Sequence, residues 1–149
     1  MTLRPEPSDS ASDLQIVAVA AIVFRGERFL AMRRAPPKPA AGLWETLSGR
    51  VSAGEEPLAA IEREIVEESA LVVRVDPRPL TAYAATRGTQ AMTVIVYVAE
   101  WVSGEVVISP EHDDHAWLTA AEFATRPGFP KLVEVVREAA RLRSAKAAP

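Results

Sequence analysis

The stretch from Gly49 to Leu71 reads GRVSAGEEPLAAIEREIVEESAL and carries the strongest structural signals in the chain. Glycines mark its opening loop, and Pro57 then suits the first turn of a helix, where the missing proline N–H costs nothing. On a helix from Pro57 to Ala70, apolar residues fall on one face and acidic residues on another. The spacing therefore predicts an amphipathic helix that follows a glycine-bearing loop.

The acidic face of this helix contains Glu64, Glu67 and Glu68, at positions i, i+3 and i+4. Like charges at this spacing repel by roughly 0.2–0.5 kcal/mol per pair, and a bound cation would reverse the sign of that cost. Carboxylate oxygens are hard ligands that suit Mg²⁺ or Mn²⁺. The alternative interpretation is a solvated acidic face opposite an apolar stripe.

The order of residues in this stretch resembles the signature of the Nudix hydrolase family, also called MutT-like. In that pattern a glycine is followed after five residues by a glutamate, and after seven more by Arg-Glu-apolar-x-Glu-Glu-x-Gly-apolar. The matching positions are Gly49, Glu55, Arg63, Glu64, Ile65, Glu67, Glu68, Ala70 and Leu71. Ala70 replaces the usual glycine, and a left-handed turn there would cost alanine about 1 kcal/mol unless the helix ends by another route.

The resemblance implies an α/β/α sandwich with a mixed central sheet, one catalytic helix and a C-terminal helix. It implies hydrolysis of a phosphoanhydride bond in a nucleoside diphosphate linked to another moiety, such as a nucleoside triphosphate, nucleotide sugar or dinucleotide. Carried over to this chain, the ligands of Mg²⁺ (or Mn²⁺) would be Glu64, Glu67, Glu68 and the backbone carbonyl of Ser48. Such an ion polarises a phosphoryl oxygen, lowers the pKa of a ligated water and orients the substrate.

Other residues are expected to support this chemistry. Arg63 can reach Glu67 at i+4 and hold a carboxylate at a fixed angle, with Glu55 and Gly49 in the same supporting set. An ordinary surface ion pair is the alternative for Arg63. Because relatives bind substrate phosphate with a basic residue near the end of the second strand, Arg34 is the candidate for that role, and a solvated strand end is the alternative.

The general base is expected in the segment EHDDH, residues 111–115, just before Trp117. Many relatives supply an additional acid from a loop at this place. Glu111 is the first choice on chemical type, with Asp113 and Asp114 as the alternatives. Each of them would otherwise be a solvated loop carboxylate.

The histidines and aromatic residues receive structural interpretations. His112 and His115 would form a metal-binding pair only on a helix, which Pro110 and the loop composition disfavour, so both are expected at the surface. Trp44 and Tyr83 are able to stack on a nucleotide base, but aromatic residues in strands more often lie in the core.

The rest of the chain predicts strands separated by turns. Runs of Val, Ile and Ala are interrupted by Gly- and Pro-containing segments, and residues 35–42 contain three prolines and are expected to form a loop. Thr119 and Glu122 have the spacing of a capping box, and residues 130–143 predict an amphipathic helix. The expected strands cover residues 15–24, 28–32, 43–47, 72–75, 80–86, 90–102 and 105–108.

Composition limits the function classes. The 149 residues suit a single domain over residues 14–149 after a disordered leader over 1–13, which lacks the apolar region of a secretory signal. The net charge of −3, without a dense basic stripe outside the C-terminal tail, disfavours nucleic-acid binding. No apolar run is long enough to span a membrane. The absence of cysteine excludes disulfides and fits a reducing compartment, so a cytoplasmic protein is expected. The resemblance implies a small-molecule nucleotide substrate as its partner. The resemblance also allows a homodimer.

Two other functions stay open. A nucleotide-sensing domain would bind without turnover, although a pure binding domain has no need for a repulsive acidic cluster. An enzyme related to isoprenoid-diphosphate isomerases is the other, because residues 46–48, Thr-Leu-Ser, depart from the usual Pro-Gly-Gly. The absence of cysteine, on which that isomerase chemistry relies, argues against it.

Overall fold

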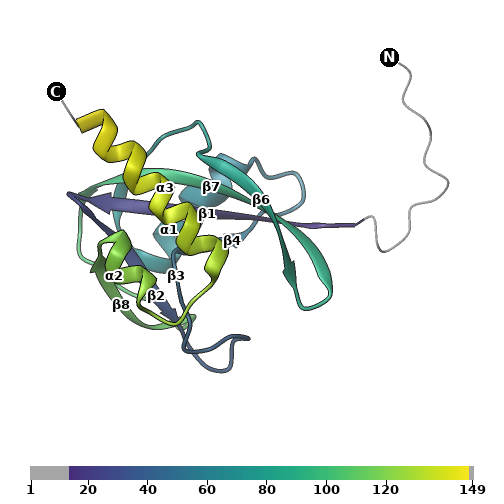
Figure 1. Cartoon of the computed structure of the whole chain (residues 1–149). Helices are drawn as coiled ribbons and strands as arrows, with labels where there is room; N and C mark the ends of the chain where they lie inside the picture. The colour runs from purple at the N-terminus through teal and green to yellow at the C-terminus, as the bar shows by residue number, and fades with distance from the viewer. Residues whose placement is uncertain (1–13, 148–149) are drawn as a thin grey trace, which may run out of the picture.

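Helices cover both faces of one mixed β-sheet in the computed structural model, which describes residues 14–147 (Figure 1). Helix α3 crosses the front of the sheet in this view and α1 lies behind it. The expected leader over 1–13 and the last two residues lie outside the described range. The elements are β1 (Ile16–Arg25), β2 (Arg28–Arg34), β3 (Trp44–Glu45), β4 (Leu47–Arg50), α1 (Pro57–Ser69), β5 (Val72–Val75), β6 (Thr81–Arg87), β7 (Gln90–Ser103), β8 (His112–Leu118), α2 (Ala120–Ala124) and α3 (Pro130–Ala147).

Strand β1 organises the sheet. It pairs in parallel with β7, in register from Ile16 opposite Met92 to Phe24 opposite Glu100. It pairs antiparallel with β2 and with β4, while β8 pairs antiparallel with the other edge of β2. A sheet that contains both pairings, with helices on both faces, confirms the predicted α/β fold class.

The side chains on the two faces of β1 belong to two separate hydrophobic cores. Successive side chains of a strand point to opposite faces, so a continuous apolar run such as residues 19–24 is buried on both. One face packs with Ile61 and Ile65 of α1, and the other packs with α3. The α3 residues in this second core are the predicted stripe Leu132, Val135, Val136 and Ala139.

Helix α1 begins at Pro57, as expected, and ends at Ser69. Ala70 follows in the left-handed conformation, with φ 60° and ψ 13°, and its N–H donates to the carbonyl of Val66 at 3.0 Å. The alanine therefore adopts the turn that glycine usually forms. The hydroxyl of Ser69 also donates to the carbonyl of Ile65 at 2.6 Å, which adds a second bond to the last turn.

Several expected elements differ in the structure. Residues 105–108 form no strand, because the N–H of Val107 donates to the carbonyl of Ser69 and the segment passes over the end of α1. The expected strand over 43–47 is divided into β3 and β4. The expected loop at 111–115 is mostly the start of β8, whose charged side chains suit a strand at the edge of the sheet. Within residues 14–147, no helix has the length and apolar character that crossing a membrane requires.

Candidate active site

Helix α1 presents its acidic face to strand β4. The Glu68 side chain is buried, with 2% exposure, and its Oε1 accepts a hydrogen bond from the Ser48 N–H at 2.8 Å. Glu64 is also largely buried, because Gly49 has no side chain and lets the carboxylate lie against the strand. The structure therefore brings together Ser48, Gly49, Glu64 and Glu68.

Arg63 contacts three carboxylates in the exposed part of this site. Its Nε and Nη2 each donate to one carboxylate oxygen of Glu55 at 3.0 Å, a bidentate arrangement. Its Nη1 donates to Glu64 at 2.8 Å and lies 3.3 Å from the nearer oxygen of Glu67. Glu55 also accepts a hydrogen bond from the Ser52 N–H at 3.1 Å, so the carboxylate that binds Arg63 is fixed to the loop before α1. This guanidinium contacts two of the predicted metal ligands, Glu64 and Glu67.

The acidic side chains are not gathered into a finished cluster. Among residues 14–147, no three His, Asp or Glu side chains are close enough together to bind one ion. The Glu67 side chain is 56% exposed and turned toward Arg63, where solvent leaves it room to rotate. The donor set nevertheless fits a hard divalent cation, because it consists of oxygens and because the Glu68 Oε2 is buried without a hydrogen-bond partner in the described chain.

Burial and mutual repulsion raise the pKa of two of these acids. Burial raises the pKa of Glu68 to about 9, against the opposing effect of the Ser48 N–H. Burial also raises the pKa of Glu64, although the bond from Arg63 opposes this. The nearby carboxylate of Glu111 adds to both increases. A site that disfavours its own negative charges is one that a cation would stabilise.

The three candidate bases have different surroundings. Glu111 lies close enough to act on Glu64 and Glu68, and its carboxylate is 3.6 Å from the Lys38 ammonium. Asp113 instead pairs with Arg33 at 2.7 Å, and Asp114 lies 4.0 Å from the same arginine. Of the three, Glu111 is the acid whose charge acts on Glu64 and Glu68 of helix α1.

The expectation that His112 lies at the surface is wrong. It is 3% exposed, and its Nε2 lies 2.8 Å from an oxygen of Glu45, which is also buried. Arg34, the candidate phosphate-binding residue, donates to the other Glu45 oxygen at 2.9 Å and to the Pro39 carbonyl at 2.8 Å. Sequence reasoning missed Glu45, although an acid between the apolar residues of a short strand was a usable signal. Trp44 is 4% exposed and Tyr83 packs partly buried against the core, so both lie where expected.

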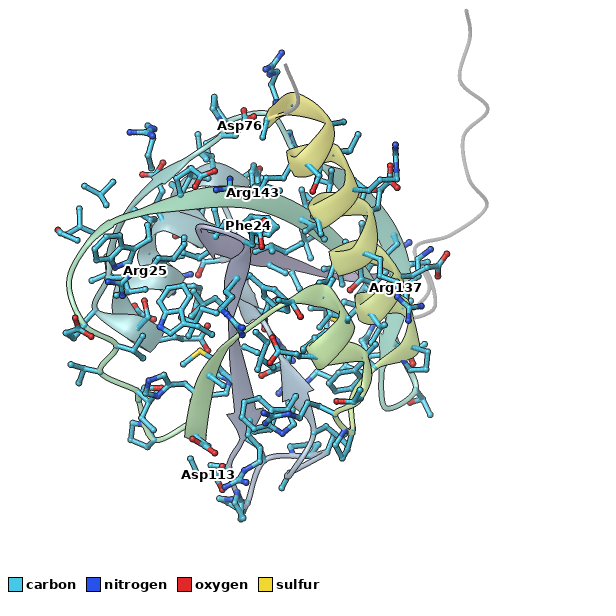
Figure 2. The ribbon with its side chains drawn as sticks, turned by 60° about the vertical axis from the view of Figure 1, so that its left-hand side comes forward. Phe24, Arg25, Asp76, Asp113, Arg137 and Arg143 are labelled. Atoms are coloured by element: carbon cyan, nitrogen blue, oxygen red, sulfur yellow. The ribbon has the colours of Figure 1, made fainter. Side chains whose placement is uncertain are left out.

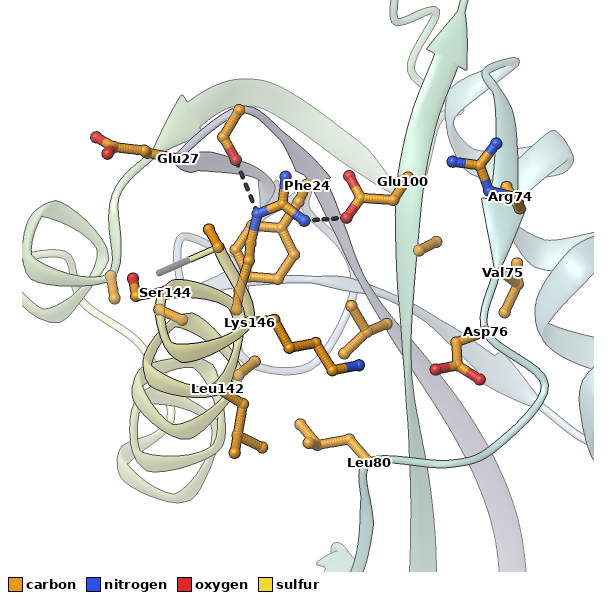
Figure 3. Close-up of a pocket in the computed structure, with 18 of the residues that line it drawn as sticks. Phe24, Glu27, Arg74, Val75, Asp76, Leu80, Glu100, Leu142, Ser144 and Lys146 are labelled. Carbon is orange, nitrogen blue, oxygen red and sulfur yellow. Dashed lines mark hydrogen bonds and ion pairs between the residues drawn. The ribbon is translucent and has the colours of Figure 1, made fainter. Parts of the chain in front are cut away.

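A cavity lies elsewhere, beside helix α3 (Figure 3). It measures about 1240 Å³ and is lined by Phe24, Leu80, Leu142 and charged residues of both signs. Asp113 lies at the opposite end of the molecule from Asp76, which lines the cavity, as Figure 2 shows. Because α3 and α1 pack on different faces of the sheet, this cavity is separate from the acidic site.

Fold and site together define an α/β/α sandwich in which Glu64 and Glu68 of one helix lie against a strand of the sheet. The chain belongs to the Nudix hydrolase family: the family model described as the NUDIX domain matches residues 14–139. It is therefore an enzyme of the class that hydrolyses diphosphate bonds in nucleotide derivatives.

One relative is named for this chemistry, another is named for a different reaction, and a solved structure shares the fold. A protein of Mycobacterium tuberculosis named putative 8-oxo-dGTP diphosphatase 2 is 36% identical over 115 residues, which is 73% of this chain and 77% of that protein. An octanoyltransferase of Myxococcus xanthus is 31% identical over 90% of this chain, but the chain spans only 39% of that protein's length. The crystal structure of a Caenorhabditis elegans Ap4A hydrolase binary complex has the same fold, with a TM-score of 0.78, 17% identity, and coverage of 87% of this chain and 98% of that one.

Proposed function

We propose that the protein is a Mg²⁺-dependent hydrolase of nucleoside diphosphate derivatives, with purine nucleoside triphosphates as the first candidate substrates. The observation that carries the proposal is the buried, unpartnered Oε2 of Glu68 beside Glu64 within the described chain, in a site whose acids repel one another. The name of the Mycobacterium tuberculosis relative supports the choice of substrate class.

Glu64, Glu67, Glu68 and the Ser48 carbonyl would hold the ion. In an extended strand, the N–H and C=O of one residue point to the same side. Because the Ser48 N–H points at Glu68, its carbonyl faces the acidic helix as well. Bound Mg²⁺ would neutralise phosphate charge and lower the pKa of a ligated water.

The protein's own groups perform the remaining tasks. Arg63, fixed by its bidentate contact with Glu55, keeps the Glu64 and Glu67 carboxylates oriented. Glu111 accepts the proton of the attacking water, from a position close enough for its charge to act on Glu64 and Glu68. Arg34 stays the candidate for contacting substrate phosphate. The expected cytoplasmic location, the homodimer, the single domain over 14–149 and the exclusion of nucleic acid as a partner also stay predictions.

A substrate panel tests the proposal. The purified chain is incubated with nucleoside triphosphates, 8-oxo-dGTP, nucleotide sugars, dinucleotides and an isoprenoid diphosphate, with Mg²⁺, with Mn²⁺ or with EDTA. We expect metal-dependent release of pyrophosphate or monophosphate from at least one nucleotide, and loss of this activity in Glu67→Gln. Nucleotide binding without turnover would favour the sensing domain instead, and double-bond isomerisation of the isoprenoid diphosphate would favour the isomerase.

A further inference from the structure

A line of polar side chains, buried except for the half-buried Arg34, leads from Glu68 through His112 and Glu45 to Arg34. His112 Nδ1 lies 3.7 Å from Glu68 Oε2, and His112 Nε2 lies 2.8 Å from Glu45 Oε2. Arg34 completes the line by donating to Glu45 Oε1 at 2.9 Å. The line connects strands β2, β3 and β8 to the predicted metal ligand on α1.

The two atoms that face each other in this line have no other partner in residues 14–147. Glu68 Oε2 and His112 Nδ1 are both buried and make no hydrogen bond. The His112 side chain has no exposed surface and the Glu68 side chain has 2%. Their separation of 3.7 Å exceeds the hydrogen-bond limit of about 3.2 Å, so a shift of a few tenths of an ångström would bring them into contact. Buried polar atoms are nearly always paired, so each atom is the natural partner of the other once one proton sits on either Nδ1 or Oε2.

The other side of the imidazole is already fixed. Glu45 is held as a carboxylate: burial raises its pKa, but the bonds from His112 and the charge of Arg34 outweigh this and the net pKa is lowered. A carboxylate only accepts hydrogen bonds, so His112 Nε2 is the donor of the 2.8 Å bond. Glu45 therefore fixes the plane of the imidazole that faces Glu68.

A β-bulge places His112 in this position. Arg33 of β2 lies opposite Asp114 of β8, whereas the next residue, Arg34, lies opposite His112, so Asp113 is the extra residue. Asp113 and Asp114 are consequently both exposed, and the histidine before them turns inward. Bulges often redirect a side chain next to a functional site, and this one aims His112 at Glu68.

We propose that His112 is a positioning residue for Glu68, oriented from behind by Glu45, and that it sets the direction in which the Glu68 carboxylate meets a divalent cation. With Oε1 on the Ser48 N–H and Oε2 against the imidazole, the carboxylate has one orientation, and the remaining lone pairs of its two oxygens stay available to a cation. Groups that orient a metal ligand in this way typically affect metal affinity or activity by 10- to 100-fold. The inference rests on the proposed function, because it requires Glu68 to be a metal ligand.

Two substitutions separate the two sides of the imidazole. In His112→Asn the amide occupies the place of Nδ1 and still faces Glu68, whereas in His112→Gln it reaches toward Glu45 and leaves Glu68 without a neighbour. His112→Phe removes both contacts and keeps the volume. His115→Asn is the matched control, because His115 lies on the same strand outside the buried line.

The readout is Mn²⁺ binding to the substrate-free protein, followed by electron paramagnetic resonance, together with kcat, KM and thermal unfolding of the metal-free variants. We expect His112→Gln and His112→Phe to weaken Mn²⁺ binding by about 10-fold or more and to lower kcat more than they raise KM, while His112→Asn stays within about threefold of the wild type. His115→Asn should match the wild type.

Unchanged Mn²⁺ binding in a folded His112→Gln protein would overturn the proposal. Equal losses in His112→Asn and His112→Gln would also overturn it, because facing Glu68 would then make no difference. If His112→Phe fails to fold, the Asn and Gln variants still decide. A wild type that binds no Mn²⁺ would instead remove the proposed function, and the inference with it, so the two failures are distinguishable.

Discussion

Gly49 and Glu64 are in such close contact that residue 49 has no room for a side chain. An ideal Cβ on residue 49 would lie 2.1 Å from Glu64 Cδ and 2.3 Å from its Oε1. The glycine is therefore required for space, and this contact explains why a glycine stands 15 positions before Glu64. What an added methyl group would displace is the carboxylate itself.

Gly49→Ala should consequently impair the site more than the fold. The methyl group pushes the Glu64 carboxylate away from β4, and we expect kcat/KM to fall by at least about 10-fold while the thermal midpoint changes little. In the Glu64→Ala background the same change should cost almost nothing, because the carboxylate is already absent. Additive losses in this double-mutant cycle, measured as kcat/KM, would contradict the steric explanation.

Glu55 should stabilise the folded protein in a pH-dependent way. The bonds from Arg63 and from the Ser52 N–H lower its pKa to about 2 in the folded state, compared with 4.5 for an ordinary glutamate. Its contribution is therefore fully present above about pH 4.5 and is lost as the pH falls toward 2. The difference in thermal midpoint between wild type and Glu55→Gln should shrink over this interval.

Activity distinguishes Glu55 from an ordinary surface ion pair. Glu138 forms the same bidentate contact with Arg141, at 2.7 and 2.9 Å, on the exposed side of α3. We expect Glu55→Gln to lower kcat by about 10-fold, because Arg63 loses its fixed orientation, and Glu138→Gln to leave kcat unchanged. Equal kcat values for the two variants would show that Arg63 needs no support.

Local patterns predicted the parts of the molecule that depend on neighbours in sequence. The limits of α1 follow from Pro57 and the apolar spacing, and the capping box at Thr119 and Glu122 is present as expected, with bonds of 3.0 and 3.2 Å. The resemblance to the Nudix signature was equally local, since it depended on one stretch of 23 residues. These features required no knowledge of the tertiary structure.

The buried polar line could not be predicted in the same way. Glu45 and His112 are 67 positions apart, and their contact exists only because β8 pairs with β2 across a bulge. A bulge changes which face a side chain occupies without leaving a clear mark in the sequence. Without knowledge of the bulge, the sequence before Trp117 is typical of a polar loop, and His112 is expected at the surface.

Glu68 should destabilise the metal-free protein increasingly as the pH rises. Its pKa is about 9 in the folded state and near 4.5 in the unfolded state. The stability that the protonated side chain contributes is therefore fully present below pH 4.5 and is lost as the pH rises through 9. Glu68→Gln cannot ionise and still offers an oxygen to the Ser48 N–H. We expect this variant to be more stable than the wild type at pH 8 in EDTA, with the gain fading toward pH 4.5.

Mg²⁺ should reverse this order of stability between the wild type and Glu68→Gln. Because a ligand that binds only the folded state raises its stability, Mg²⁺ is expected to raise the thermal midpoint of the wild type but much less that of Glu68→Gln. Thermal scans at pH 8 with and without Mg²⁺ check both statements. A variant less stable than the wild type in EDTA at pH 8 would contradict the raised pKa.

Ala70 offers a stability change that should leave the chemistry intact. It is exposed and held at φ 60°, a conformation that costs an alanine roughly 1–2 kcal/mol and a glycine almost nothing. We therefore expect Ala70→Gly to increase the free energy of unfolding by about 0.5–1 kcal/mol, after the greater entropy of glycine in the unfolded chain is subtracted. Ala59→Gly, at an exposed position inside α1, should lower it by about 1 kcal/mol. Urea unfolding of both variants measures these opposite changes in the free energy of unfolding, and kcat should be unchanged in each. A loss of stability in Ala70→Gly would show that the left-handed turn carries no strain for alanine.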